Sequence, residues 1–237
     1  MKVPILIPNI FNHPFTYESD LKLKEGDYVV VPFGKSELTG VVWNEFEKKN
    51  DKNFAIKKVL RKLNVPSLKK NIIQFLNWFS EYNMIPKGMA LKLTLLNSNA
   101  VEKISSELYE QFKINIKQSK IELSKEQKNC LKKMNTFNHK FRVHVLQGTT
   151  GSGKTMVYFE ALKEIINKGF QGLILLPEIG LTGQFQKKFI EFFGFSPAVW
   201  HSGVTKKNKE IIWSGVANDK IKVVIGARSS LFLKSLD

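Results

Sequence analysis

Gly148-Thr149-Thr150-Gly151-Ser152-Gly153-Lys154-Thr155 fits the phosphate-binding pattern G-x-x-x-x-G-K-[ST] at every position. Glycines allow a tight turn in which successive backbone N–H groups point at phosphate oxygens. A helix that follows such a loop offers further N–H groups and the positive end of its dipole to the same anion. The pattern predicts a loop that binds a nucleoside triphosphate, with Lys154 on the β- and γ-phosphates and Thr155 on a magnesium ion.

The flanks of this loop favour that interpretation over a glycine-rich turn that happens to precede a lysine. Residues 141–147 are apolar and β-prone, which predicts a buried strand, and apolar spacing predicts a helix over 154–168. Further along, predicted strands at 172–177, 198–201 and 221–226 alternate with helices at 181–193 and 204–216, and Gly194 is placed to end a helix. This alternation predicts a parallel α/β sheet with the phosphate loop at the carboxyl end of a strand.

Residues 1–66 indicate a different, mostly β, architecture. We expect strands at 3–8 and 56–63, a loop at 11–17 that leads into a second extended piece, and a hairpin formed by 27–33 and 38–46. Short strands joined by tight turns predict a small barrel. Such a barrel can be a simple spacer, or it can present aromatic and basic side chains to nucleic acid.

Between these regions the sequence predicts helices and a linker. Residues 67–82 have helical apolar spacing with Ser67 as N-cap, and their aromatic side chains are expected in the core. A second short helix is expected within 86–96, and the polar stretch 97–120 is interpreted as a linker. Ser124 and Gln127 have the spacing of a capping box at the start of the next helix.

Composition limits the classes of protein to consider. No apolar run is long enough for a membrane span, and the first residues predict a strand rather than a signal peptide. The single cysteine, Cys130, excludes an intramolecular disulfide and a cysteine-rich metal site in this chain, which favours a reducing cytoplasm. The formal charge of +16 is spread over both halves and favours nucleic acid as a partner, although a general lysine bias would give the same charge.

Several segments together resemble one protein family. Residues 176–182 (Leu-Pro-Glu-Ile-Gly-Leu-Thr), 201–203 (His-Ser-Gly) and 225–232 (Ile-Gly-Ala-Arg-Ser-Ser-Leu-Phe) resemble the first helicase lobe of the bacterial PriA family, the superfamily 2 helicases of replication restart. Residues 14–17, 26–34 and 40–42 are similar to that family's 3′-DNA-end-binding domain. The resemblance covers about 1–96 and 121–237. It implies an end-binding domain at 1–96, a linker at 97–120 and a RecA-like helicase lobe at 121–237.

The resemblance also implies roles for particular residues. Gln127 would read the adenine edge, while its spacing alone gives it only a capping role, and the two are compatible. The phosphates of one DNA strand would be bound by Thr182, Arg228 and Ser229, although residues 177–182 can also serve only to shape a loop. The pocket for a terminal 3′ nucleotide would be built from Phe15, Thr16, Gly34 and Lys57, with a core role for Phe15 as the alternative. The family usually has an acidic residue where this chain has Thr16.

The implied activity is that of an ATP-dependent 3′-to-5′ DNA helicase that uses ATP and Mg²⁺. Its partners would be forked, 3′-ended or single-stranded DNA, other primosome proteins and single-stranded-DNA-binding protein, in the bacterial cytoplasm and without a membrane. Residues 97–120 are too few for the family's winged-helix domain. The acidic box, second lobe and zinc module are expected beyond Asp237, so we expect an N-terminal fragment that alone binds nucleotide weakly and does not unwind DNA. The rival interpretations are a non-catalytic DNA-end-binding protein and an unrelated P-loop kinase.

Overall fold

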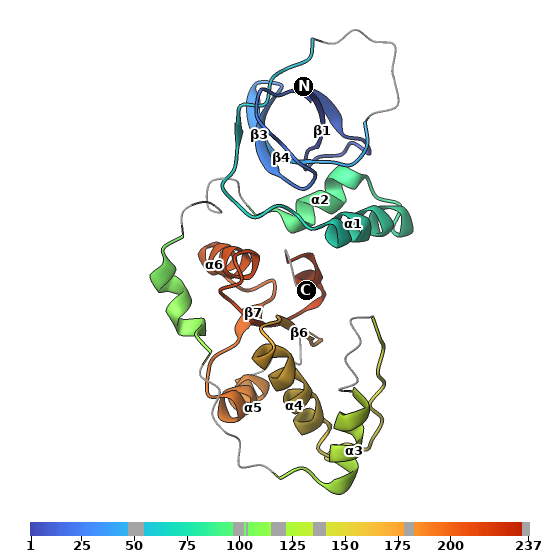
Figure 1. Cartoon of the computed structure of the whole chain (residues 1–237), viewed down its shortest axis with the longest axis vertical. Coiled ribbons are helices and arrows are strands. Elements are labelled where there is room, and N and C mark those ends of the chain that lie inside the picture. The colour runs from blue at the N-terminus through green and yellow to red at the C-terminus, as the bar shows by residue number, and fades with distance from the viewer. Residues whose placement is uncertain are drawn as a thin grey trace.

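The computed structural model contains two sheets. A small barrel lies at one end of the molecule and the helix α3 lies at the other (Figure 1). It describes residues 1–46, 55–96, 102, 104–114, 122–134, 141–177 and 183–233. Among these residues, none of the helices combines the length and the apolar character needed to cross a bilayer.

The first sheet has five strands in the order β2-β1-β4-β3-β5, and each strand pairs antiparallel with its neighbours in this order. The strands are β1 Lys2–Leu6, β2 Phe15–Glu18, β3 Tyr28–Phe33, β4 Ser36–Val42 and β5 Arg61–Lys62. The two edges meet where Glu18 pairs with Lys58, flanked by backbone bonds from Glu18 N to Lys57 O (2.9 Å) and from Val59 N to Glu18 O (2.8 Å). Closure of this kind removes free edges, so the predicted barrel is confirmed.

Alternation along these strands fills the barrel. Val29 and Val31 of β3 point into an interior core with β1 and β4 side chains, while Tyr28 and Val30 point outward into a second core. The turn between β3 and β4 contains Gly34 at φ 60°, a left-handed conformation that glycine adopts without strain. The predicted hairpin is therefore present, with β3 and β4 in register from Tyr28↔Val41 to Phe33↔Ser36.

Two helices, α1 Lys70–Tyr82 and α2 Lys87–Thr94, lie between the barrel and the rest of the chain (Figure 1). The predicted N-cap of the first helix is wrong: the N-cap is Lys69, and Ser67 instead donates a hydrogen bond to Asp27 Oδ1 (2.7 Å). The Asp27 carboxylate is charged, and hydrogen bonds to a charged acceptor are stronger than those between neutral groups. The Ser67 hydroxyl therefore bonds to Asp27. The expectation that the α1 aromatics are core also fails in part, because Trp78 and Tyr82 are 54% and 72% exposed.

The second sheet is parallel, in the order β6-β8-β7, with β6 Gly172–Leu175, β7 Ala198–Trp200 and β8 Val223–Gly226. Helices α4 Lys154–Asn167 and α5 Gly183–Phe193 pack with Val223 and Ile225, whereas α6 Lys206–Ala217 packs with Val224. Alternating β8 side chains therefore face helices on both sides of the sheet, as in a RecA-like lobe. Gly194, at φ 79°, donates its N–H to Ile190 O (2.8 Å) and ends α5 as predicted.

The strand predicted at 141–147 is wrong. Over the described residues this segment joins neither sheet, and Phe141, Val143 and Val145 are 92%, 74% and 88% exposed. Apolar, β-prone residues make a strand only where a neighbouring strand accepts their hydrogen bonds, and the edge of the β6-β8-β7 sheet does not reach them. The phosphate loop is therefore approached by extended chain rather than by a laddered strand.

Barrel and lobe share one apolar core at their junction. Trp213 of α6 is 1% exposed, lies edge-on to Tyr28 of β3 (ring centroids 6.0 Å apart), and donates from Nε1 to Thr94 O (2.7 Å). The 3₁₀ helix η1, Ser106–Phe112, lies beside α6, where Tyr109 Oη donates to Ser214 Oγ (3.0 Å). The η1 part of the connecting chain is thus packed on the lobe.

Candidate nucleotide and DNA-binding sites

The phosphate loop takes a shape that requires glycine at two positions. Gly151 and Gly153 have φ 83° and 79°, the left-handed region that residues with a Cβ rarely adopt. At Gly153 a Cβ would also lie 2.3 Å from Gln127 Nε2. Gly153 is the N-cap of α4, so the loop leads directly into the helix end that offers free N–H groups to an anion.

Lys154 lies across this loop. Its Nζ donates to Gly148 O (2.6 Å) and to Thr149 O (2.7 Å), while the Thr155 hydroxyl accepts a bond from Tyr158 Oη (3.3 Å). A cavity of about 700 Å³ opens beside residues 150–156 and is also lined by Lys188, Glu191 and Phe192 of α5. No motif marks these three α5 residues, since only the packing of α5 against α4 brings them to the loop.

Gln127, on α3 (Lys125–Met134), forms the predicted capping box and also contacts the phosphate loop. Ser124 N donates to Gln127 Oε1 (2.9 Å) and Gln127 N donates to Ser124 Oγ (3.2 Å), which satisfies two N–H groups at the start of the helix. Gln127 Nε2 donates in addition to Ser152 O (3.2 Å). Its side chain therefore ties α3 to the loop, and its predicted contact with adenine stays a prediction.

A second group of predicted residues lies at the carboxyl end of β8. Arg228 and Ser229 begin the 3₁₀ helix η3, Arg228–Phe232, and both are exposed. Two hydrogen bonds hold Ala227, the residue before η3, in place. Ala227 N donates to Trp200 O (3.0 Å), and buried Ser230 donates from Oγ to Ala227 O (2.5 Å). This arrangement presents two donors to solvent, where they can reach phosphate oxygens. Thr182, predicted to act with them, lies outside the described residues.

The residues predicted to hold a DNA end gather at one end of the barrel. Lys57 Nζ donates to Gly34 O (3.3 Å), and nothing lies within 4 Å of the place a Gly34 Cβ would occupy. Phe15 and Thr16 start β2 and are half-buried, with the Phe15 ring 5.4 Å from that of Phe33, the neighbour of Gly34. The structure thus brings Phe15, Gly34 and Lys57 to one open corner.

Three further aromatic residues, namely Phe11, His13 and Phe33, lie at this corner and were not assigned to it from the sequence. Phe11 and His13 lie 5.2 Å and 4.9 Å from Phe15 by ring centroids, and Phe11 lies 6.2 Å from Phe33. Asn12 and His13 form a bend just before β2, so no regular spacing in the sequence predicts that Phe11 and His13 would lie beside Phe15. The cluster supports both interpretations of Phe15, because it is part of an apolar group and close to solvent.

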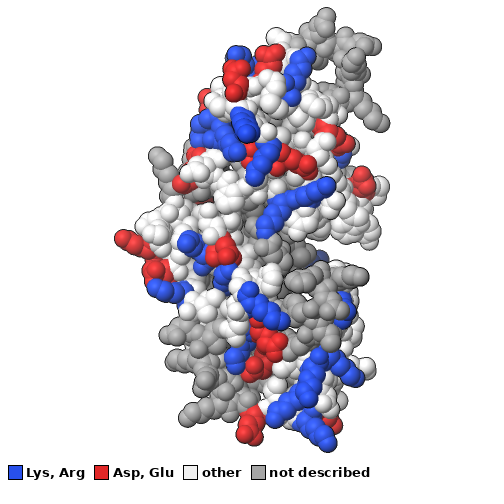
Figure 2. Space-filling view, viewed as in Figure 1, with Lys and Arg blue, Asp and Glu red and all other residues white. Residues whose placement is uncertain are grey.

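Basic side chains are not confined to either domain. Figure 2 shows Lys and Arg over both halves of the face in view, interspersed with Asp and Glu. Across the described ranges, no group of three His, Cys, Asp or Glu side chains could hold a metal ion by itself. The Thr155 hydroxyl lies at the first turn of α4, and its predicted contact with magnesium stays a prediction.

Comparison with known proteins finds a family match for each of the two regions. The family described as 3'DNA-binding domain (3'BD) matches residues 2–95, and the family described as Type III restriction enzyme, res subunit, matches residues 120–236. The chain is 40% identical over 235 residues to Replication restart protein PriA of Rickettsia conorii, and 28% identical over 230 residues to that of Helicobacter pylori. These matches cover 98% and 93% of this chain but 35% and 33% of the relatives' own length.

A 3′-DNA-binding barrel followed by a RecA-like lobe with a phosphate loop defines a helicase-type, DNA-binding protein. More narrowly, the chain belongs to the PriA family of replication restart proteins, and it spans about a third of the length of the curated relatives it matches.

Proposed function

We propose that this chain supplies the ATP-binding lobe and the DNA-end-binding domain of an ATP-dependent 3′-to-5′ DNA helicase that acts in replication restart. The observation that carries the proposal is the phosphate loop: two left-handed glycines and the start of α4 surround a space that Lys154 closes with two hydrogen bonds. Both bonds go to backbone carbonyls of the same loop, so the lysine can exchange them for phosphate oxygens without moving the backbone.

In this proposal each residue has a separate task. Bound ATP supplies the phosphoryl group whose transfer to water releases the free energy for translocation. Lys154 neutralises the phosphates, Thr155 ligates magnesium, and Gln127 keeps α3 against the loop beside the nucleotide. Arg228 and Ser229, exposed at the carboxyl end of β8, bind the phosphates of one DNA strand together with Thr182.

The barrel's task is to bind a terminal nucleotide at its open corner. Phe15, within reach of the other aromatic rings, offers a surface on which a base can stack, and Lys57 can bind the adjacent phosphate. Gly34 leaves room for the sugar because nothing fills the space beside it. Thr16, where the family usually has a carboxylate, offers a hydroxyl that both donates and accepts.

The wider biological setting belongs to the same proposal. Forked and 3′-ended DNA, other primosome proteins and single-stranded-DNA-binding protein are its partners, and the bacterial cytoplasm is its compartment. Support comes from the name of the relatives, Replication restart protein PriA, and from the matched 3′-DNA-binding domain.

Lys154→Ala tests the proposal directly. Binding of a fluorescent ATP analogue with Mg²⁺ is titrated with the purified chain, and we expect affinity to fall by about tenfold or more, because a charge-assisted contact to phosphate contributes about 1.5–3 kcal/mol. Lys168→Ala, just past the other end of α4, removes the same charge and should leave affinity unchanged.

Equal affinity in the Lys154→Ala and unaltered chains would contradict the proposed nucleotide site. In the full-length gene product, ATP turnover stimulated by forked DNA should disappear with Lys154→Ala. A protein that binds 3′ ends but neither binds nor hydrolyses ATP would instead be the non-catalytic end-binding protein.

A further inference from the structure

The His-Ser-Gly segment at residues 201–203 takes no part in the sites described above, although it lies close to one of them. Strand β7 ends at Trp200, which pairs with Gly226 at the end of β8. Parallel neighbours end at the same edge of a sheet and lie about 4.8 Å apart. His201, the first residue after β7, is therefore beside the turn after β8 that presents Arg228 to solvent.

One backbone hydrogen bond determines which nitrogen of the His201 ring carries the proton. Gly203 N donates to His201 Nδ1 (3.1 Å). Because a backbone N–H can only donate, Nδ1 is the acceptor, and the proton of the neutral ring is on Nε2. His201 is half-buried, and among the described residues none accepts a hydrogen bond from Nε2. The histidine therefore has an N–H donor that no described residue uses.

The other two residues of the segment hold the ring in this orientation. A Cβ on Gly203 would lie 3.2 Å from His201 Cε1 and 3.3 Å from Nδ1, closer than ordinary van der Waals contact, so glycine lets the ring approach the backbone. Lys209 of α6 donates from Nζ to Ser202 O (3.2 Å) and lies 6.0 Å from the centroid of the Trp200 ring. The segment is thus one unit, tied to α6 on one side and to the histidine ring on the other.

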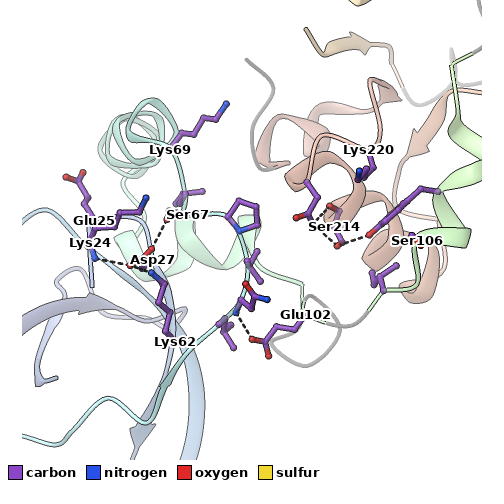
Figure 3. A pocket seen from close by; sticks show the side chains of 18 residues that line it. Lys24, Glu25, Asp27, Lys62, Ser67, Lys69, Glu102, Ser106, Ser214 and Lys220 are labelled. Atoms are coloured by element: carbon purple, nitrogen blue, oxygen red, sulfur yellow. Dashed lines mark hydrogen bonds and ion pairs between the residues drawn. The ribbon is translucent and has the colours of Figure 1, made fainter. Parts of the chain in front are cut away.

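Helix α6, which follows the segment, is anchored at both ends. The Thr205 side chain caps its first turn, and Ser214 near its other end accepts a hydrogen bond from Tyr109 Oη (3.0 Å). Figure 3 shows Ser214 beside the cavity of about 960 Å³ between the barrel, the linker and the lobe, across from Lys62 of the barrel. A donor on a rigid support loses little conformational entropy when a ligand binds. The imidazole is therefore preorganised for a ligand at the sheet edge.

We propose that His201 donates from Nε2 to a phosphate oxygen of a DNA strand, next to the phosphates bound by Arg228 and Ser229. The inference rests on the proposed DNA-binding function of those two residues. Phosphate oxygens only accept hydrogen bonds, and the imidazole N–H, the guanidinium and the hydroxyl at this edge all donate. The neutral imidazole adds a contact that positions the strand without adding a charge that attracts it.

Two substitutions of His201 separate the donor from a purely structural role. His201→Gln is long enough to place an amide N–H where Nε2 lies. The shorter His201→Asn keeps an acceptor for Gly203 N near the place of Nδ1 and does not reach the place of Nε2. We expect His201→Asn to weaken DNA binding about tenfold, the size expected for one hydrogen bond to a charged acceptor, and His201→Gln to weaken it by about twofold or less.

Binding is measured by fluorescence anisotropy with the purified chain and an oligothymidylate of about 15 nucleotides, at about pH 8 and at several salt concentrations. The fluorophore is on the 3′ end, which keeps that end out of the barrel corner. Arg228→Gln removes a charge and should reduce the slope of log K against log salt by about 0.7, the value for one phosphate contact on a single strand. His201→Asn removes no charge from the neutral ring, so the slope should stay unchanged while affinity falls.

His144→Asn is the matched control, because it makes the same change at an exposed histidine before the phosphate loop, and it should alter neither affinity nor slope. Gly203→Ala tests the support of the ring: the added Cβ forces the imidazole to shift, which should weaken binding about threefold. Thermal unfolding checks the fold of each variant, and Gly203→Ala decides the question if both His201 variants unfold the chain.

Unaltered affinity in His201→Asn would overturn the proposal. So would a loss in His201→Gln as large as or larger than that in His201→Asn, since the bond from Gly203 N would then be the only role of the ring. A reduced salt slope in His201→Asn would show a cation rather than a neutral donor and would also overturn it. If Arg228→Gln leaves binding unchanged, the proposed DNA-binding edge itself is wrong. If only the His201 variants are without effect, that function stands and this inference fails.

Discussion

The barrel and the helicase lobe differ in how their binding sites are supported. In the barrel, strands pair around a closed ring, and the corner of Phe15, Gly34 and Lys57 lies on paired strands and one tight turn. In the lobe, the chain that enters the phosphate loop is extended and exposed, and the loop is held by α4 and by the Gln127 side chain. The barrel site is therefore preformed by backbone pairing, whereas the shape of the phosphate loop depends on a few side-chain contacts.

The junction of the two regions should show the largest effect of a single substitution. Trp213→Ala removes a fully buried indole that packs on Tyr28 and a hydrogen bond to Thr94 O, so we expect a loss of about 4 kcal/mol in the free energy of unfolding. Denaturant unfolding followed by tryptophan fluorescence and by circular dichroism measures it. Trp213→Phe, which keeps most of the apolar area, should cost about half as much, and a loss below about 1 kcal/mol for Trp213→Ala would show that the two domains do not depend on this contact.

The next largest effect is expected inside the barrel. Asp27→Ala removes a fully buried carboxylate and leaves the Lys62 ammonium and the Ser67 hydroxyl without their acceptor, which should destabilise the chain by about 3 kcal/mol. Asp20→Ala is the matched control, because its carboxylate pairs with Lys58 but is 81% exposed, and it should cost less than about 0.5 kcal/mol. Similar losses for the two variants would contradict the role assigned to the buried network.

Asp27 also gives the barrel a pH dependence of known sign. Burial alone would raise its pKa, but hydrogen bonds from Lys62, Ser67 and the Lys24 N–H outweigh burial and hold the pKa below its ordinary 3.8. A depressed folded-state pKa stabilises the fold above the unfolded-state value and stops doing so as pH falls through the folded-state value. The stability difference between the unaltered chain and Asp27→Ala should therefore be constant from about pH 7 to 5 and shrink below about pH 4, as measured by unfolding at each pH.

Local patterns predicted most of the architecture. Strand alternation identified the barrel hairpin, helical spacing identified α4, α5 and α6 to within about two residues at each end, and the Ser124–Gln127 spacing identified a capping box that the structure contains. What failed depended on partners distant in sequence. Ser67 bonds to Asp27, forty residues away, and residues 141–147 lack a neighbouring strand among the described residues.

The candidate sites also differ in whether a local sequence pattern could predict them. The phosphate loop is contiguous in sequence, so its glycines, Lys154 and Thr155 could be named from the motif. The corner of Phe15, Gly34 and Lys57 is assembled from three separate segments, and no local pattern relates them. Trp78 and Tyr82 were expected in the core because helical spacing places aromatic residues on a face without saying how much of that face the neighbouring elements cover.

A smaller effect is expected where one side chain supports the phosphate loop. Gln127→Ala removes one half of the capping box and the hydrogen bond to Ser152 O, which should destabilise α3 by about 1 kcal/mol and free the loop. Hydrogen exchange at the amides of α3 and of residues 149–153 should quicken about fivefold, the factor that corresponds to about 1 kcal/mol. Lys128→Ala, its exposed neighbour, should leave exchange unchanged, and an unaltered rate in Gln127→Ala would show that α4 alone maintains the loop.

The smallest effect is expected on the extended chain that leads to the phosphate loop, and it tests the comparison of the two regions directly. Val145→Thr replaces a side chain that is 88% exposed and should change the free energy of unfolding by less than about 0.5 kcal/mol. Val31→Thr makes the same chemical change in the closed barrel, where the side chain is fully buried and an added hydroxyl has to lose its water, so it should cost about 2 kcal/mol. Denaturant unfolding of both variants measures the difference. Equal costs would mean that Val145 is packed in solution as closely as Val31, and the phosphate loop would then rest on a paired strand after all.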